Sequence, residues 1–171
     1  MGSSIESQLK TLKLEANSYK KLGDFTKSEK SILKGLELKP EDNSFNHELA
    51  KIFFKNARYN KCLQLLLKLS KRIKRRQILF KDIAMCYYKM NKLEESLDAV
   101  QISLSENPDN ISSLYVEGLI YRELGDFEKS ISSFTKLLSL DSNHRDTLYQ
   151  LGKIYHQNGR YREALDAFDK V

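Results

Sequence analysis

Apolar and small residues recur along this chain with a period of 34 residues. One bulky aromatic position returns five times, at Tyr19, Phe53, Tyr87, Tyr121 and Tyr155. A small residue stands three positions before each of these and another nine positions after it. Apolar residues spaced three and four apart predict amphipathic helices, and a period of this length is typical of stacked helical hairpins.

The repeats span residues 9–42, 43–76, 77–110, 111–144 and a shortened 145–171, after an N-terminal extension of residues 1–8 whose start reads as the remnant of an expression tag. Turn residues that tolerate the left-handed backbone separate the two helices of most repeats, at Gly23, Asn91, Gly125 and Gly159. The second repeat has Ala57 there, where that conformation costs about 1 kcal/mol, so we expect Asn56 to adopt it instead. Pro40 and Pro108 suit the first turn of the helix that follows.

These columns resemble the tetratricopeptide repeat, a helix–turn–helix with a Leu-Gly-x-x-Tyr core followed by a small residue, Phe and Pro. The resemblance covers residues 9–171. It implies an all-α fold, a right-handed superhelical solenoid of five tandem helical hairpins in which each hairpin buries its apolar side against the next. Repeat 43–76 departs furthest from the family pattern, so we expect it to be the least regular.

In this family the first helix of each hairpin lines a concave groove that holds a partner. Carried over by column, the groove residues here are Lys13, Asn17, Lys20, Lys51, Phe54, Lys55, Lys81, Met85, Tyr88, Tyr115, Leu119, Arg122, Tyr149 and Lys153. Lysines attract acidic groups, and aromatic rings offer contact area at a low entropy cost. The predicted partner is therefore another protein or peptide with acidic residues or a free C-terminus; the alternative is that these lysines form only a solvated surface.

The resemblance also allows one particular groove to be checked. Chaperone-binding members hold a C-terminal carboxylate with a five-residue clamp, and Lys13 and Asn17 match two of its positions. The other three fall on Glu48, Ile78 and Asp82. Two of those residues are carboxylates, which would repel the ligand. We therefore do not expect that ligand.

Charge is unevenly distributed along the chain. Residues 1–85 carry 19 Lys and Arg against 9 Asp and Glu, a net charge of +10, whereas residues 86–171 carry 10 against 14, a net charge of −4. This asymmetry keeps two alternatives open: an RNA-associated helical repeat using the basic half, and head-to-tail self-association. The basic run Lys71–Arg76 fits either a nucleic-acid or nuclear-localisation patch or a solvated helix end.

Residues that would carry catalysis are not arranged for it. His47, His144 and His156 lack metal-ligand spacing, and we find no nucleophile triad or phosphate loop, so we predict no enzyme activity, cofactor or metal. Cys62 and Cys86 fit buried thiols in a reducing compartment, and a cytoplasmic location is expected. No apolar run reaches the roughly 20 residues of a membrane span. The uncovered apolar side of the last repeat suggests a piece of a longer protein, in which this could also be an accessory domain of an enzyme.

Overall fold

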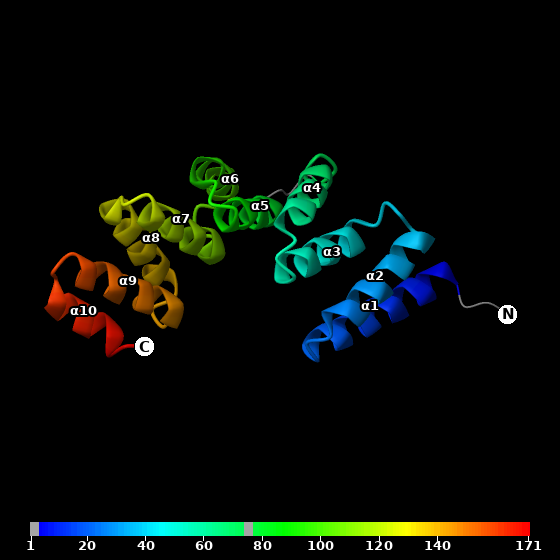
Figure 1. The fold of residues 1–171 in the computed structure, drawn as a ribbon, viewed down its shortest axis with the longest axis horizontal. Helices are drawn as coiled ribbons and strands as arrows, with labels where there is room; N and C mark the ends of the chain where they lie inside the picture. The colour runs from blue at the N-terminus through cyan, green and yellow to red at the C-terminus, as the bar shows by residue number, and fades with distance from the viewer. Residues whose placement is uncertain (1–3, 74–76) are drawn as a thin grey trace. The chain divides into compact units, whose positions relative to one another are not determined.

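The computed structural model describes residues 4–73 and 77–171, and every regular element in them is a helix (Figure 1). The ten helices are α1 (Ile5–Lys21), α2 (Phe25–Leu38), α3 (Asn43–Lys55), α4 (Tyr59–Ser70), α5 (Gln77–Lys89), α6 (Leu93–Glu106), α7 (Ile111–Glu123), α8 (Phe127–Leu140), α9 (Arg145–Gln157) and α10 (Tyr161–Phe168). Consecutive helices pack in pairs, α1 with α2 through α9 with α10. The predicted all-α architecture of five hairpins is confirmed.

The hairpins fall into two compact units. The N-terminal unit, Met1–Lys74, contains α1 to α4, and the C-terminal unit, Arg75–Val171, contains α5 to α10. In the first, Ile32, Phe45 and Ile52 form a buried cluster between the hairpins. In the second, a corresponding cluster joins the last two hairpins and includes Phe134 and Ile154. Each unit therefore has its own apolar core, as expected for stacked repeats.

The turns inside the hairpins follow the predicted backbone, with one correction. Gly23, Gly125, Gly159 and Asn91 have positive φ. Ala57 also does, at φ 55, whereas Asn56 has φ −88, so the expectation that Asn56 would adopt the strained conformation was wrong. The reason is the pattern of hydrogen bonds that closes each turn: the amide of Ala57 donates to the carbonyl of Phe54 at 3.0 Å, as Gly23 does to its own first helix. That pattern fixes which position is left-handed, and Ala57 occupies it at a cost.

The starts of the helices also correct the sequence analysis. Pro40 and Pro108 lie in the loops before α3 and α7, not in the first turns of those helices. The side chain of Asp42 caps α3, accepting from the amides of Ser44 at 3.0 Å and Phe45 at 3.1 Å, and Asn110 caps α7 in the same way. These capping residues stand two positions after each proline, and each helix begins at the residue that follows its cap.

The structure also describes part of the N-terminal extension and of the divergent repeat. α1 begins at Ile5 because the Ser4 hydroxyl accepts from the amide of Ser7 at 3.3 Å, so residues 5–8 are helical. The second hairpin is well formed, with Leu66 and Leu69 each 1% exposed, although α4 has 12 residues where α2, α6 and α8 have 14. Residues 74–76 of the basic run lie outside the described part of the chain.

In three of the hairpins, the small residue in the second helix has a polar role beyond allowing close approach. The hydroxyls of Ser28, Ser96 and Ser130, all buried, donate to the carbonyls of Ala16, Ala84 and Gly118 in the first helix, at 2.8, 2.7 and 2.7 Å. A buried hydroxyl needs such a partner. These bonds therefore fix each second helix against its first.

Two different residue pairs fill the centre of the hairpins. Where the second helix presents Phe134 or Phe168, the first helix has Gly118 or Gly152, and an added Cβ there would lie under 3.0 Å from the ring. In the other three hairpins an alanine faces an aliphatic residue, in the pairs Ala16 and Ile32, Ala50 and Leu66, and Ala84 and Val100. The larger ring thus requires the smaller neighbour.

Candidate functional site

The predicted groove residues divide between the two units. Those of α1 and α3, here called the lysine face, are Lys13, Asn17, Lys20, Lys51, Phe54 and Lys55. Those of α5, α7 and α9, here called the tyrosine face, are Lys81, Met85, Tyr88, Tyr115, Leu119, Arg122, Tyr149 and Lys153. All of them come from the first helix of a hairpin, as the repeat columns predict.

Side-chain contacts join α1 to α3 across the lysine face. The Nζ of Lys20 binds Oε2 of Glu48 at 2.6 Å, and the Nζ of Lys51 binds Oε1 of the same carboxylate at 2.9 Å. The Nζ of Lys13 donates to the hydroxyl of Ser44 at 2.6 Å. The lysines of two successive hairpins are thereby brought onto one surface.

Glu48 is the acidic member of this surface, and the repeat columns also place it on the groove side of the second repeat. Its side chain is 22% exposed. Partial burial alone would raise the pKa of this carboxyl, but the hydrogen bonds from Lys20 and Lys51 outweigh it and lower the pKa below its usual range. Glu48 is therefore ionised at neutral pH and neutralises part of the field of the two lysines.

The rest of the lysine face combines charge with one aromatic ring. Lys13 and Lys55 are exposed, and Asn17 is half-buried. The half-buried ring of Phe54 packs edge-on against Tyr59, with 5.3 Å between centroids. With Lys20 and Lys51 included, the lysine face has four lysines and one carboxylate, that of Glu48, so these five residues carry a net charge of +3. The surface can attract an anion and offers an apolar edge beside it.

On the tyrosine face, one polar chain links three first helices. The hydroxyl of Tyr88 on α5 donates to Oε1 of Glu123 on α7 at 3.2 Å. Arg122 beside it binds Glu123 and also reaches Gln150 on α9. The Arg122 side chain is only 17% exposed. This arginine therefore connects neighbouring helices and presents little of itself to a ligand.

The same contacts account for the shifted pKa values on this face. Burial, followed by the charge of Glu123, raises the pKa of Tyr88, and burial also raises that of Tyr115. The hydrogen bond from Arg122 is the main cause that lowers the pKa of Glu123. At neutral pH both tyrosines are neutral hydroxyl donors, and the carboxylate is charged.

Accessible aromatic surface on this face comes from tyrosines. Tyr149 is 49% exposed; its ring lies 6.0 Å from that of Phe168, and the Nζ of Lys153 lies 5.7 Å from its centroid. Tyr115 is half-buried, with 5.5 Å between its ring and that of His144. These rings rest on the core of their own hairpins and are held in fixed positions.

Three predicted groove residues of the tyrosine face differ in the surface area and charge that they present. Leu119 is 8% exposed and belongs to the apolar core, so it contributes little surface. Lys81 binds the neighbouring Asp82 at 2.5 Å, and its charge is thus partly neutralised. Met85 is half-buried on α5.

Two contacts that sequence columns did not predict share one spacing. Lys20 and Glu48 are 28 residues apart, and so are Arg122 and Gln150. In both units the cation sits in the last turns of one first helix and its acceptor in the next first helix. This repeated spacing is the sequence signal that would have found Gln150 and the partner that each cation binds.

Two family models match the chain. The model described as "TPR repeat" matches residues 118–159, and the one described as "Tetratricopeptide repeat" matches residues 14–42. The chain contains tetratricopeptide repeats at these residues. Such repeats serve as protein-interaction scaffolds and are typically not catalytic.

Solved structures of other tetratricopeptide repeat proteins have the same fold. The Thermus thermophilus protein TTC0263 superposes with a TM-score of 0.81 at 21% identity, over 98% of this chain and 89% of that one. Pseudomonas aeruginosa pilF gives 0.84 at 15% identity, over 98% and 77%. YrrB, described as a TPR protein with an unusual peptide-binding site, gives 0.67 at 18% identity, over 91% and 80%. The search of curated proteins finds no match.

A metal site or a membrane-spanning helix would point to a different function. Within 4–73 and 77–171, no three His, Cys, Asp or Glu side chains are grouped to hold a metal ion. In the same residues, no helix combines the length and apolar character that crossing a membrane requires. The lysine and tyrosine faces therefore remain the surfaces on which a functional proposal can be built.

Proposed function

We propose that this tetratricopeptide repeat protein is a scaffold that binds an acidic polypeptide segment on the first-helix faces of its hairpins. The observation that carries the proposal is the lysine face: four lysines on two adjacent helices, with one carboxylate among them. Such a field accelerates and orients the approach of an acidic partner. The half-buried Phe54 ring adds apolar contact next to the charges.

The tyrosine face supports the same function by a different route. The rings of Tyr149 and Tyr115 pack against those of Phe168 and Phe134, with ring centroids 6.0 and 5.9 Å apart. Rigid aromatic side chains commonly dominate the energy of protein interfaces. This surface therefore suits apolar or aromatic residues of a polypeptide.

The test uses fluorescence anisotropy with a labelled peptide of six consecutive glutamates between Gly-Ser flanks. The K13A/K51A/K55A variant should bind it at least tenfold more weakly than the wild type at 50 mM salt, and the difference should shrink at higher salt. A peptide with six glutamines should bind neither protein.

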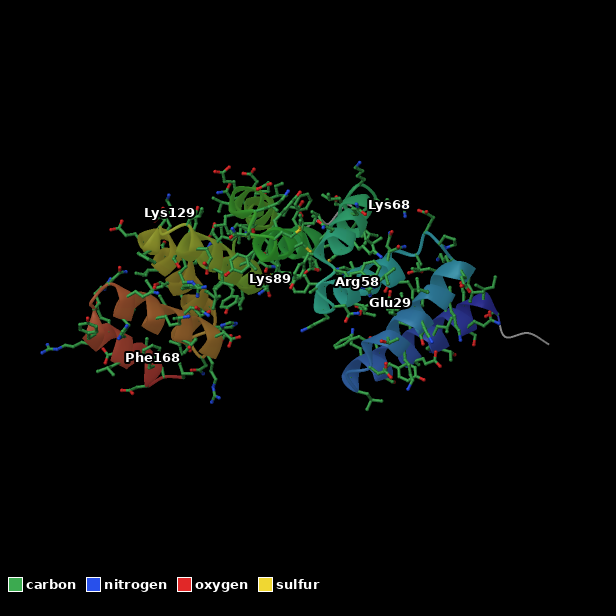
Figure 2. The ribbon with its side chains drawn as sticks, viewed as in Figure 1. Glu29, Arg58, Lys68, Lys89, Lys129 and Phe168 are labelled. Atoms are coloured by element: carbon green, nitrogen blue, oxygen red, sulfur yellow. The ribbon has the colours of Figure 1, made fainter. Side chains whose placement is uncertain are left out.

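The matched control is K30A/K34A/K68A, which removes the same charge from exposed lysines of α2 and α4 (Lys68 is labelled in Figure 2). Equal loss in both triple variants would show general electrostatic attraction and overturn the proposal. A labelled RNA that binds more tightly than the acidic peptide, with a steep salt dependence, would replace it with the nucleic-acid alternative. Head-to-tail self-association stays a prediction, which sedimentation over a range of concentration and salt would test.

A further inference from the structure

Glu48 occupies the centre of the lysine face. Its two carboxylate oxygens are divided between Lys20 of α1 and Lys51 of α3, at 2.6 and 2.9 Å. The Lys20 and Lys51 side chains remain 35% and 46% exposed. A ligand anion that approaches these two ammonium groups therefore meets lysines that already hold a carboxylate.

In the C-terminal unit, the repeat position equivalent to Glu48 holds a residue without a negative charge. Gln150 stands there, 28 residues after Arg122, and accepts a hydrogen bond from it through a neutral amide. The charge of Arg122 is met by Glu123 on its own helix instead. The hairpin contact therefore needs an acceptor at this position, but it does not need a negative charge.

A negative charge beside the two lysines has a predictable effect on ligands. Two carboxylates about 5 Å apart repel one another enough to reduce affinity by about fourfold in bulk water and by more than a hundredfold near a protein surface, so a loss of about tenfold lies between these limits. A short acidic ligand that binds Lys20 and Lys51 meets this repulsion fully. A longer acidic segment can also use Lys13 and Lys55, both exposed, which lie on the same helices.

We propose that Glu48 is a resident carboxylate that sets a charge threshold, so that the lysine face binds segments with several consecutive acidic residues and discriminates against ligands with one or two. This inference rests on the proposed binding of acidic polypeptides. It names the residue that decides how acidic the partner must be.

The experiment compares two peptides, with two and with six consecutive glutamates, against wild type and E48Q in anisotropy competition at 50 mM salt. In the wild type, the longer peptide should bind far more tightly. In E48Q, which reproduces the Gln150 arrangement, the two-glutamate peptide should tighten about tenfold and the six-glutamate peptide at most about threefold. The ratio of the two affinities should therefore fall.

The control is E37Q, which removes the same charge from an exposed position on α2 and should leave the ratio unchanged. E48D keeps the charge and should retain the wild-type ratio; circular dichroism melts confirm that each variant is folded. An unchanged ratio in a folded E48Q, or an equal fall in E37Q, overturns the inference while the proposed function stands. If the wild type binds neither peptide, the proposed function itself fails.

Discussion

The two units build the same repeat from different chemistry. In the N-terminal unit, the first helices of the hairpins present lysines, two of which bind Glu48. In the C-terminal unit, they present tyrosines beside a series of hydrogen bonds that runs from Tyr88 to Gln150. In both units, a cation on the first helix of one hairpin binds an acceptor on the first helix of the next hairpin. The repeat thus fixes where helices meet, and the residues at a few surface positions decide what the surface can attract.

The interior shows the same kind of difference. The N-terminal unit fills its hairpins with an alanine facing Ile32 or Leu66, whereas the last two hairpins of the C-terminal unit use a glycine facing a phenylalanine. Each pair fills a similar space.

Gly118→Ala should destabilise the protein by about 3 kcal/mol, because the new methyl group would clash with the Phe134 ring. Phe134→Val alone should also destabilise it, by leaving a cavity. The double variant G118A/F134V reproduces the Ala84 and Val100 pair and should be more stable than the sum of the single changes predicts. Urea denaturation followed by circular dichroism measures this; additive losses would contradict paired packing.

Arg58→Ala should destabilise the N-terminal unit by about 1.5 kcal/mol. The Arg58 guanidinium joins two hairpins by binding Glu29 (Figure 2), with 3.1 Å between Nη1 and Oε1, and lies 4.5 Å from the Phe53 ring. The repeat-equivalent Arg160 binds Glu163 within its own hairpin and is exposed. Arg160→Ala should therefore change stability much less, and equal losses in thermal denaturation would argue against the cross-hairpin role.

Ala57→Gly should stabilise the protein by about 0.5 to 1 kcal/mol, because glycine accepts φ 55 without the clash of a Cβ. In the C-terminal unit the reverse change, Gly125→Ala at φ 79, should destabilise by a similar amount. Urea midpoints of the two variants should move in opposite directions. No gain from Ala57→Gly would show that the turn holds no strain.

The fold was predictable because each repeat marks the same positions with the same kinds of residue. The 34-residue spacing fixed the hairpins, and glycine or asparagine marked four of the five left-handed turns. An alanine such as Ala57 does not indicate a left-handed turn, and only the hydrogen-bond pattern of the turn reveals its conformation. The predicted starts of α3 and α7 relied on the two prolines and were wrong, because Asp42 and Asn110 are the residues that cap these helices.

The repeat columns predicted which helices carry the candidate surface residues, but not how the charges of those residues are balanced. Repeat columns place Lys20 and Arg122 on first-helix faces, and the structure has them there. They do not say which acceptor each cation meets, since that acceptor comes from a neighbouring hairpin. Leu119 shows the same limit, because a column position alone did not reveal that its side chain joins the core.

The two interior pairings have a consequence for how such a chain can change over generations. Starting from an alanine that faces an aliphatic residue, a single substitution to phenylalanine collides with the methyl group, and a single substitution to glycine leaves a void. Neither first step is neutral. A barrier of folding stability therefore separates the two pairings, and converting one into the other takes two substitutions together.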